Sequence, residues 1–113
     1  IKMKKTKKKN RRIVPKVLKN ANLSGKTIAL FGCGDSESYS DTFCDGMGIL
    51  FEDLKDSGCT FVGAVPDSDY TYASSVAAAD GKFVGLALDD VNESDRTDAR
   101  VSAWTEILKA NLA

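Results

Sequence analysis

The sequence contains no histidine, only two prolines and a single tryptophan among its 113 residues. Without histidine, the Ser-His-Asp and Cys-His catalytic arrangements, imidazole metal ligands and histidine proton shuttles are all excluded. Long apolar runs are also missing, so neither a membrane-spanning helix nor membrane insertion is expected. A chain of this length has room for one small domain.

Cysteine is sparse as well. The three cysteines, Cys33, Cys44 and Cys59, are odd in number and far apart, and no C-x-x-C pair occurs. This pattern indicates neither a disulfide framework nor a zinc or iron–sulfur site. Free thiols are typical of a reducing compartment, so we expect an intracellular protein.

Charge is unevenly distributed, although the formal net charge is zero. Residues 1–20 contain ten Lys or Arg and no acid, so the remaining residues carry a net charge of −10. We expect residues 1–16 to be a basic, disordered tail and residues 17–113 to form the folded domain. A basic run is also typical of nucleic-acid contacts or nuclear localisation, but this one lacks interleaved aromatic residues, which favours a solvated tail.

Apolar periodicity in the domain predicts alternating strands and helices. Three short apolar runs predict buried strands: Thr27–Phe31, Thr60–Val65 and Lys82–Leu88. A spacing of three and four residues predicts a helix over 40–57, and a second helix is expected from Thr97 onward. Residues 66–81 and the acidic Asp89–Asp95 are predicted loops. The expected fold class is α/β, with a parallel sheet covered by helices on both faces and with fewer strands than such sheets usually have.

Phe31–Asp45 is the segment that points to a ligand. It leaves a strand and enters a helix, which is where open α/β sheets bind ligands. Gly32 and Gly34 allow the backbone to approach a flat molecule, and amides of residues 32–35 are suited to donate to the carbonyls of a planar heterocycle. Tyr39 is placed to stack on such a ring. The alternative is a tight turn on which Tyr39 is merely exposed.

The stretch GKTIALFGCGDSESYSDTFCDGMGIL resembles the flavin-contacting half of a flavodoxin. The resemblance continues through DGKFVGLALDDVNESDRTDARVSAW and covers roughly residues 22–112. Residues 66–81 correspond to the insertion in the last strand of long-chain flavodoxins of the algal or cyanobacterial kind. The resemblance implies a doubly wound, flavodoxin-like sheet. Because the phosphate-binding loop and the second flavin loop of the family have no counterpart, we expect a fragment equivalent to the C-terminal half only.

The resemblance also implies a function, which is to carry one electron at a time on bound FMN rather than to act as an enzyme. The residues implied on the isoalloxazine side are Gly32, Cys33, Gly34, Asp35, Tyr39, Thr42 and Cys44. In that family the tyrosine ring stacks on the outer face of the flavin, and nearby carboxylates favour a low reduction potential. The implied partners are basic redox proteins, such as a ferredoxin-NADP reductase or a photosystem-type donor, attracted by the acidic domain.

Two alternatives remain open: a flavodoxin-like remnant without a cofactor, and a nucleic-acid-associated protein that acts through the basic tail. Nucleic-acid binding would collapse with salt and disappear on deletion of residues 1–12. The expected location is the cytoplasm or the chloroplast stroma, because residues 1–16 lack the Ser-rich character of a transit peptide.

Overall fold

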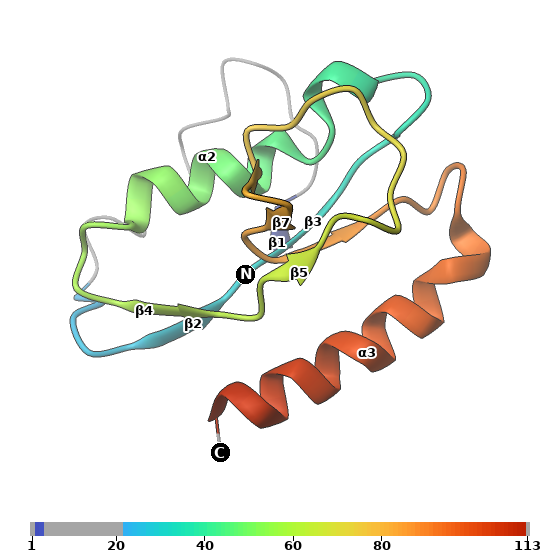
Figure 1. Cartoon of the computed structure of the whole chain (residues 1–113). Helices are drawn as coiled ribbons and strands as arrows, with labels where there is room; N and C mark the ends of the chain where they lie inside the picture. The colour runs from blue at the N-terminus through green and yellow to red at the C-terminus, as the bar shows by residue number, and fades with distance from the viewer. Residues whose placement is uncertain (1, 4–21, 113) are drawn as a thin grey trace.

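The structure, a computed structural model, describes residues 2–3 and 22–112 (Figure 1). Its centre is one extended segment formed by β2 (Thr27–Ala29) and β3 (Phe31–Cys33), which are joined by the fully buried Leu30. The nearly continuous apolar run along this segment places apolar side chains on both faces of the sheet, as expected for a strand covered on two sides.

Two later strands pair in parallel with the successive halves of this segment. β4 (Thr60–Val62) runs beside β2, with Thr27 opposite Thr60. β8 (Leu86–Leu88) runs beside β3, with Phe31 opposite Leu86. β4 and β8 therefore occupy the place of a single strand that residues 63–85 interrupt.

The interrupting segment folds into a small antiparallel sheet of its own. Its strands are β5 (Val65–Pro66), β6 (Ala78–Ala79) and β7 (Lys82–Phe83), in the order β5-β7-β6. The prediction of continuous strands over Thr60–Val65 and Lys82–Leu88 is therefore wrong, and the predicted loop over 66–81 contains strand residues.

Two glycines explain where the chain leaves and rejoins the main sheet. Gly63 follows β4 with φ +87°, a left-handed conformation that turns the chain away. Gly85 precedes β8, and a Cβ there would lie 2.2 Å from the carbonyl oxygen of Leu30. Only glycine allows the returning chain to come this close to the central strand.

The α-helices of the described residues, α2 and α3, lie on opposite sides of the main sheet (Figure 1). α2 (Asp45–Leu54) packs through Phe51 on Phe61, with ring centroids 4.7 Å apart. α3 (Ser94–Leu112) packs through Trp104, whose Nε1–H donates to the carbonyl of Gly63 at 2.8 Å. Within the described ranges, no helix has the length and apolar character needed to cross a membrane.

Both predicted helices have different bounds in the structure. The one expected over 40–57 is divided into a 3-10 turn, η2 (Ser40–Thr42), and α2, because Cys44 has φ +55° and interrupts the helical backbone. The last helix begins three residues before Thr97. The carbonyl of Asp89 accepts the Glu93 N–H at 3.0 Å, and this turn leads directly into α3.

One short strand falls in the segment predicted to be a disordered tail. β1 (Lys2–Met3) pairs in parallel with β3, with Lys2 opposite Phe31, and gives the order β1-β3-β8. The physical reason is that the second edge of β3 offers backbone groups that pair readily with another strand. The remainder of the predicted tail, and the connector up to residue 21, lie outside the described residues.

The buried core joins the main sheet, α2 and the inserted segment. Its largest fully buried apolar side chains are Phe43, Phe83, Leu30, Met47, Leu50 and Leu54. The α/β class, the parallel main sheet and the two covering helices agree with the sequence-based prediction.

Candidate functional site

Two loops meet at the carboxyl edge of the main sheet. The first, residues 34–39, follows β3, and the second, residues 89–93, follows β8. Because β3 and β8 are adjacent and parallel, the loops leave the sheet side by side. The Gly34 N–H donates to the carbonyl of Leu88 at 2.9 Å, so this amide extends the strand pairing and is not directed to a ligand.

Asp35 closes the first loop on itself. Its Oδ1 accepts the backbone N–H of Ser38 at 2.9 Å and that of Glu37 at 3.2 Å, and its carbonyl accepts the N–H of Tyr39 at 2.9 Å. The Ser38 amide, followed by the side-chain amide of Asn92, holds the pKa of Asp35 below its ordinary value. The Asp35 carboxylate thus organises the loop that carries Tyr39.

Asp89, at the start of the second loop, is fully buried. Its Oδ2 accepts the Ser36 N–H at 3.0 Å and the Ser36 hydroxyl at 2.5 Å, while its Oδ1 accepts the N–H of Val91 at 3.1 Å and that of Asn92 at 2.9 Å. Burial by itself would raise the pKa of Asp89, but the hydrogen bonds from Ser36 and Asn92 outweigh it and lower the pKa to about 2. Asp89 is therefore ionised at neutral pH.

Asn92 ties the two loops together. Its Nδ2 donates to Asp35 Oδ1 at 2.8 Å and to Asp89 Oδ2 at 3.0 Å. The amides of residues 36–39 thus find acceptors within these two loops. From the sequence, Asp89 and Asn92 are predicted only as members of the acidic loop Asp89–Asp95. The available signal was an aspartate directly after the wholly apolar run Leu86–Leu88.

Tyr39 and Thr42 lie at the outer surface of this edge. The Tyr39 residue is 49% exposed and stands directly before η2, where its carbonyl accepts the Thr42 N–H at 3.2 Å. Thr42 is exposed on η2 itself. An exposed aromatic ring on a preformed loop is suited to stack on a flat molecule.

The remaining predicted site residues lie beneath this surface. Gly32 is buried inside β3, and Cys33 is half-buried at the end of that strand. Cys44 is buried, with its Sγ 3.8 Å from the Gly32 carbonyl oxygen, and burial raises the pKa of its thiol to about 12. A Cβ at Gly34 would lie 2.8 Å from Phe43 Cδ1, so glycine is required there. These residues lie beneath the exposed surface of the candidate site, and the raised pKa keeps the Cys44 thiol protonated at neutral pH.

The inserted segment forms hydrogen bonds with the residues that follow Tyr39. These contacts were not predicted from the sequence. The Ala73 N–H donates to Ser40 Oγ at 2.7 Å, and the Ser74 hydroxyl donates to the Asp41 carbonyl at 2.8 Å. The Val76 N–H donates to Asp45 Oδ1 at 2.9 Å. Residues 40–45 are therefore fixed from one side by the insertion.

The geometry suits a flat, uncharged ring better than a phosphate. The Tyr39 ring and the close-lying glycine backbone fit a flat, uncharged heterocycle. Residues 31–45 contain four carboxylates and no Lys or Arg, and this charge would repel a phosphate. The described residues also contain no group of His, Cys, Asp or Glu side chains that could hold a metal ion.

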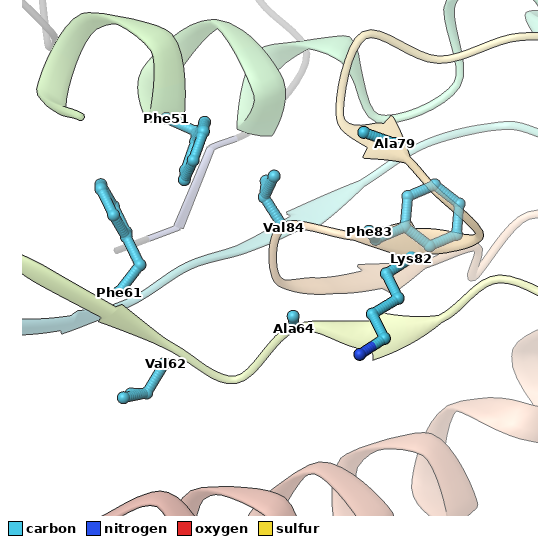
Figure 2. A pocket seen from close by; sticks show the side chains of 8 residues that line it. All are labelled: Phe51, Phe61, Val62, Ala64, Ala79, Lys82, Phe83 and Val84. Atoms are coloured by element: carbon cyan, nitrogen blue, oxygen red, sulfur yellow. The ribbon is translucent and has the colours of Figure 1, made fainter.

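An apolar pocket of about 210 Å³ lies elsewhere, between α2 and β4. Its lining residues are Phe51, Phe61, Val62, Ala64, Ala79, Lys82, Phe83 and Val84. Figure 2 shows Phe51 and Phe61 turned toward each other, whereas the Lys82 ammonium points away from them. A ligand site needs a few convergent polar groups, which this lining does not provide. The loops at the carboxyl edge are therefore the candidate site.

Comparison with known proteins shows strong similarity over most of the chain. A family model described as Flavodoxin matches residues 2–104. Flavodoxin 1 of Azotobacter vinelandii is 47% identical over 88 residues, which make up 78% of this chain and 51% of that protein. A flavodoxin of Trichodesmium erythraeum is 46% identical over 95 residues, or 84% of this chain and 56% of that protein. The chain thus spans about half the length of the relatives that it matches.

A solved structure shows the same fold. Flavodoxin of Fusobacterium nucleatum, bound to flavin mononucleotide, matches with a TM-score of 0.85 at 28% identity, covering 96% of this chain and 68% of that one. A variant of the same protein, also bound to flavin mononucleotide, matches with a TM-score of 0.87 at 25% identity. These likenesses confirm the predicted fold class.

Proposed function

Because the chain belongs to the flavodoxin family, we propose that it provides the isoalloxazine-binding edge of an FMN-dependent one-electron carrier. The observation that carries this proposal is the exposed Tyr39 ring on a loop whose amides are already hydrogen-bonded. FMN, when bound, supplies the electron-carrying chemistry. The protein's own task is to hold the ring and to set its electrostatic surroundings, which is the work of a carrier rather than of a catalyst.

Each site residue has a proposed part in holding the ring. Tyr39 stacks on one face, and the backbone of Cys33, Gly34 and Asp35 lines the pyrimidine edge. Gly32, Thr42 and Cys44 complete the floor and side of the site. The acidic surroundings disfavour negative charge on the reduced ring, so they favour electron donation.

The inserted segment supports assignment to the long-chain type. β4 and β8 pair with consecutive halves of one strand, and residues 63–85 leave the sheet between them. An interruption of the last strand by a tyrosine-containing insertion is the feature that distinguishes long-chain members.

The charge of the domain suits a basic redox partner. Residues 21–113 have a formal net charge of −10, which accelerates encounter with cationic proteins at low salt. A ferredoxin-NADP reductase or a photosystem-type donor is the proposed kind of partner. A location in the cytoplasm or the chloroplast stroma belongs to the same proposal.

Flavin titration of the full chain tests the function. We expect FMN and riboflavin to be bound with similar, weak affinity, because the described loops fit the ring and not the phosphate. Flavin fluorescence should be quenched by the wild type and by Tyr39→Phe, which retains an aromatic ring, and should not be quenched by Tyr39→Ala. Absence of quenching by a folded wild-type chain, checked by circular dichroism, contradicts the proposal.

A further inference from the structure

We propose that Asp89 is a positioning residue for the first loop of the candidate site. Through Ser36, its buried carboxylate holds residues 35–39 in the conformation that presents Tyr39. This inference rests on the proposed function for its consequence, but it concerns the chain's own geometry. It gives a task to a charged group that does not belong to the predicted ligand-lining set.

The surroundings of Asp89 are unusual for a buried charge, because its described partners are neutral. They are three backbone amides, one hydroxyl and one side-chain amide, contributed by Ser36, Val91 and Asn92. A buried carboxylate without a cation is tolerated only when its hydrogen bonds are complete. The carboxylate and its donors are thus mutually dependent, and loss of either side leaves buried polar groups unpaired.

Only some of these contacts are local. Those to Val91 and Asn92 span two and three residues and shape the entry to α3. Those to Ser36 span 53 residues and join the second loop to the first. Replacing Ser36 therefore tests the connection between the loops without removing the local turn.

The connection reaches Tyr39 through Asn92 and Asp35. Ser36 is fixed by Asp89, and its neighbour Asp35 is held by Asn92 at 2.8 Å. Asp35 in turn accepts the amides of Ser38 and Tyr39 at 2.9 Å each. Ser36 is thus anchored directly to the buried carboxylate, Asp35 is anchored through Asn92, and the amides of residues 37–39 are anchored through Asp35.

Amide hydrogen exchange in the full chain, without flavin, tests the positioning role. The variants are Asp89→Asn and the milder Ser36→Ala, which removes only the hydroxyl bond. Asp90→Asn is the control, since it neutralises the adjacent, exposed carboxylate. We expect exchange at residues 36–39 to accelerate about tenfold or more in both test variants, relative to the amides of α2, and to remain unchanged in the control.

FMN titration of the same proteins provides the second readout. Affinity should fall about tenfold in Asp89→Asn, equivalent to about 1.4 kcal/mol, and remain unchanged in Asp90→Asn. If residues 36–39 exchange as slowly in both test variants as in the wild type, Asp89 does not position the loop. Unaltered FMN affinity despite faster exchange also overturns the inference. If the wild type binds no FMN, the proposed function fails, and the exchange data alone decide the positioning role.

Discussion

At the scale of single residues, Asp89 links stability to pH. Its pKa is about 2 in the folded chain, against about 3.9 in an unfolded one. Because the folded pKa is the lower, the stabilisation is complete above about pH 4 and is lost as the pH falls through about 2. We predict that wild type loses up to about 2 kcal/mol more free energy of unfolding over this window than Asp89→Asn. Urea titrations of both proteins at pH 6, 4, 3 and 2 measure this difference. If the free energies of unfolding of the wild type and of Asp89→Asn fall equally with pH, Asp89 is not the group responsible.

At Gly34, the neighbouring residues leave no space for a side chain. A Cβ there would come within 2.8 Å of the buried Phe43 ring and 3.0 Å of the Cys44 amide nitrogen. Gly34→Ala should therefore destabilise the chain by about 1–3 kcal/mol through overpacking. The exposed Glu37→Ala on the same loop should change stability by less than about 0.5 kcal/mol. Urea unfolding followed by far-ultraviolet circular dichroism compares them, and equal midpoints would contradict the prediction.

At the scale of elements, the inserted segment and α2 are packed without space between their backbones. A Cβ on Gly48, within α2, would lie 2.6 Å from backbone atoms of Val76 and Ala77. Gly48→Ala should raise helix propensity and still destabilise the chain by about 1–3 kcal/mol, because backbone cannot move aside as a side chain can. Urea unfolding measures the effect. If Gly48→Ala is more stable than the wild type, the backbone of the inserted segment does not pack against α2.

A matched control for this element is Glu52→Ala on the exposed face of α2. Glu52 pairs with Lys55 at 2.8 Å, and both side chains are about half exposed. Such a surface pair contributes little, so the variant should remain within about 0.5 kcal/mol of wild type in the same urea experiment.

At the scale of the whole molecule, the acidic carboxyl edge should govern encounter with a basic redox protein. Glu37 and Asp41 are exposed on either side of Tyr39. Replacing them together by Gln and Asn should slow association with a cationic one-electron acceptor several-fold at low salt, and the difference should disappear at about 0.5 M salt. Stopped-flow mixing of the flavin-loaded chain measures both rates. A salt-independent difference would point to lost contacts rather than lost charge.

The neutral total charge of the chain is compatible with this behaviour. Ten basic residues lie within residues 1–20, and all acidic ones lie beyond them. Steering depends on the local field at the surface that the partner meets rather than on the formal sum. The acidic edge can therefore attract a cation although the formal charges of the chain cancel.

Features that depend on neighbouring residues were predictable from the amino-acid order alone. The apolar runs located the strand segments without their interruptions, and the three-and-four spacing located α2, although the predicted helix began five residues before α2 and ended three residues after it. The segment from Phe31 to Asp45 indicated the candidate site because its glycines and its tyrosine lie close together along the chain. Helix boundaries were less predictable, since the left-handed backbone at Cys44 is imposed by packing.

The contacts between segments that are distant in the sequence became apparent only in the folded chain. Alternation of apolar residues cannot show that β4 and β8 share one partner strand, because pairing depends on where the chain returns. In the sequence, Asp89 cannot be distinguished from a solvent-exposed acid. The structure shows that it is buried and hydrogen-bonded to Ser36, which is 53 residues away. The insertion likewise reaches Ser40 across 33 residues. Local sequence sets conformational preference, whereas burial and long-range hydrogen bonds arise only when the folded chain brings their partners together.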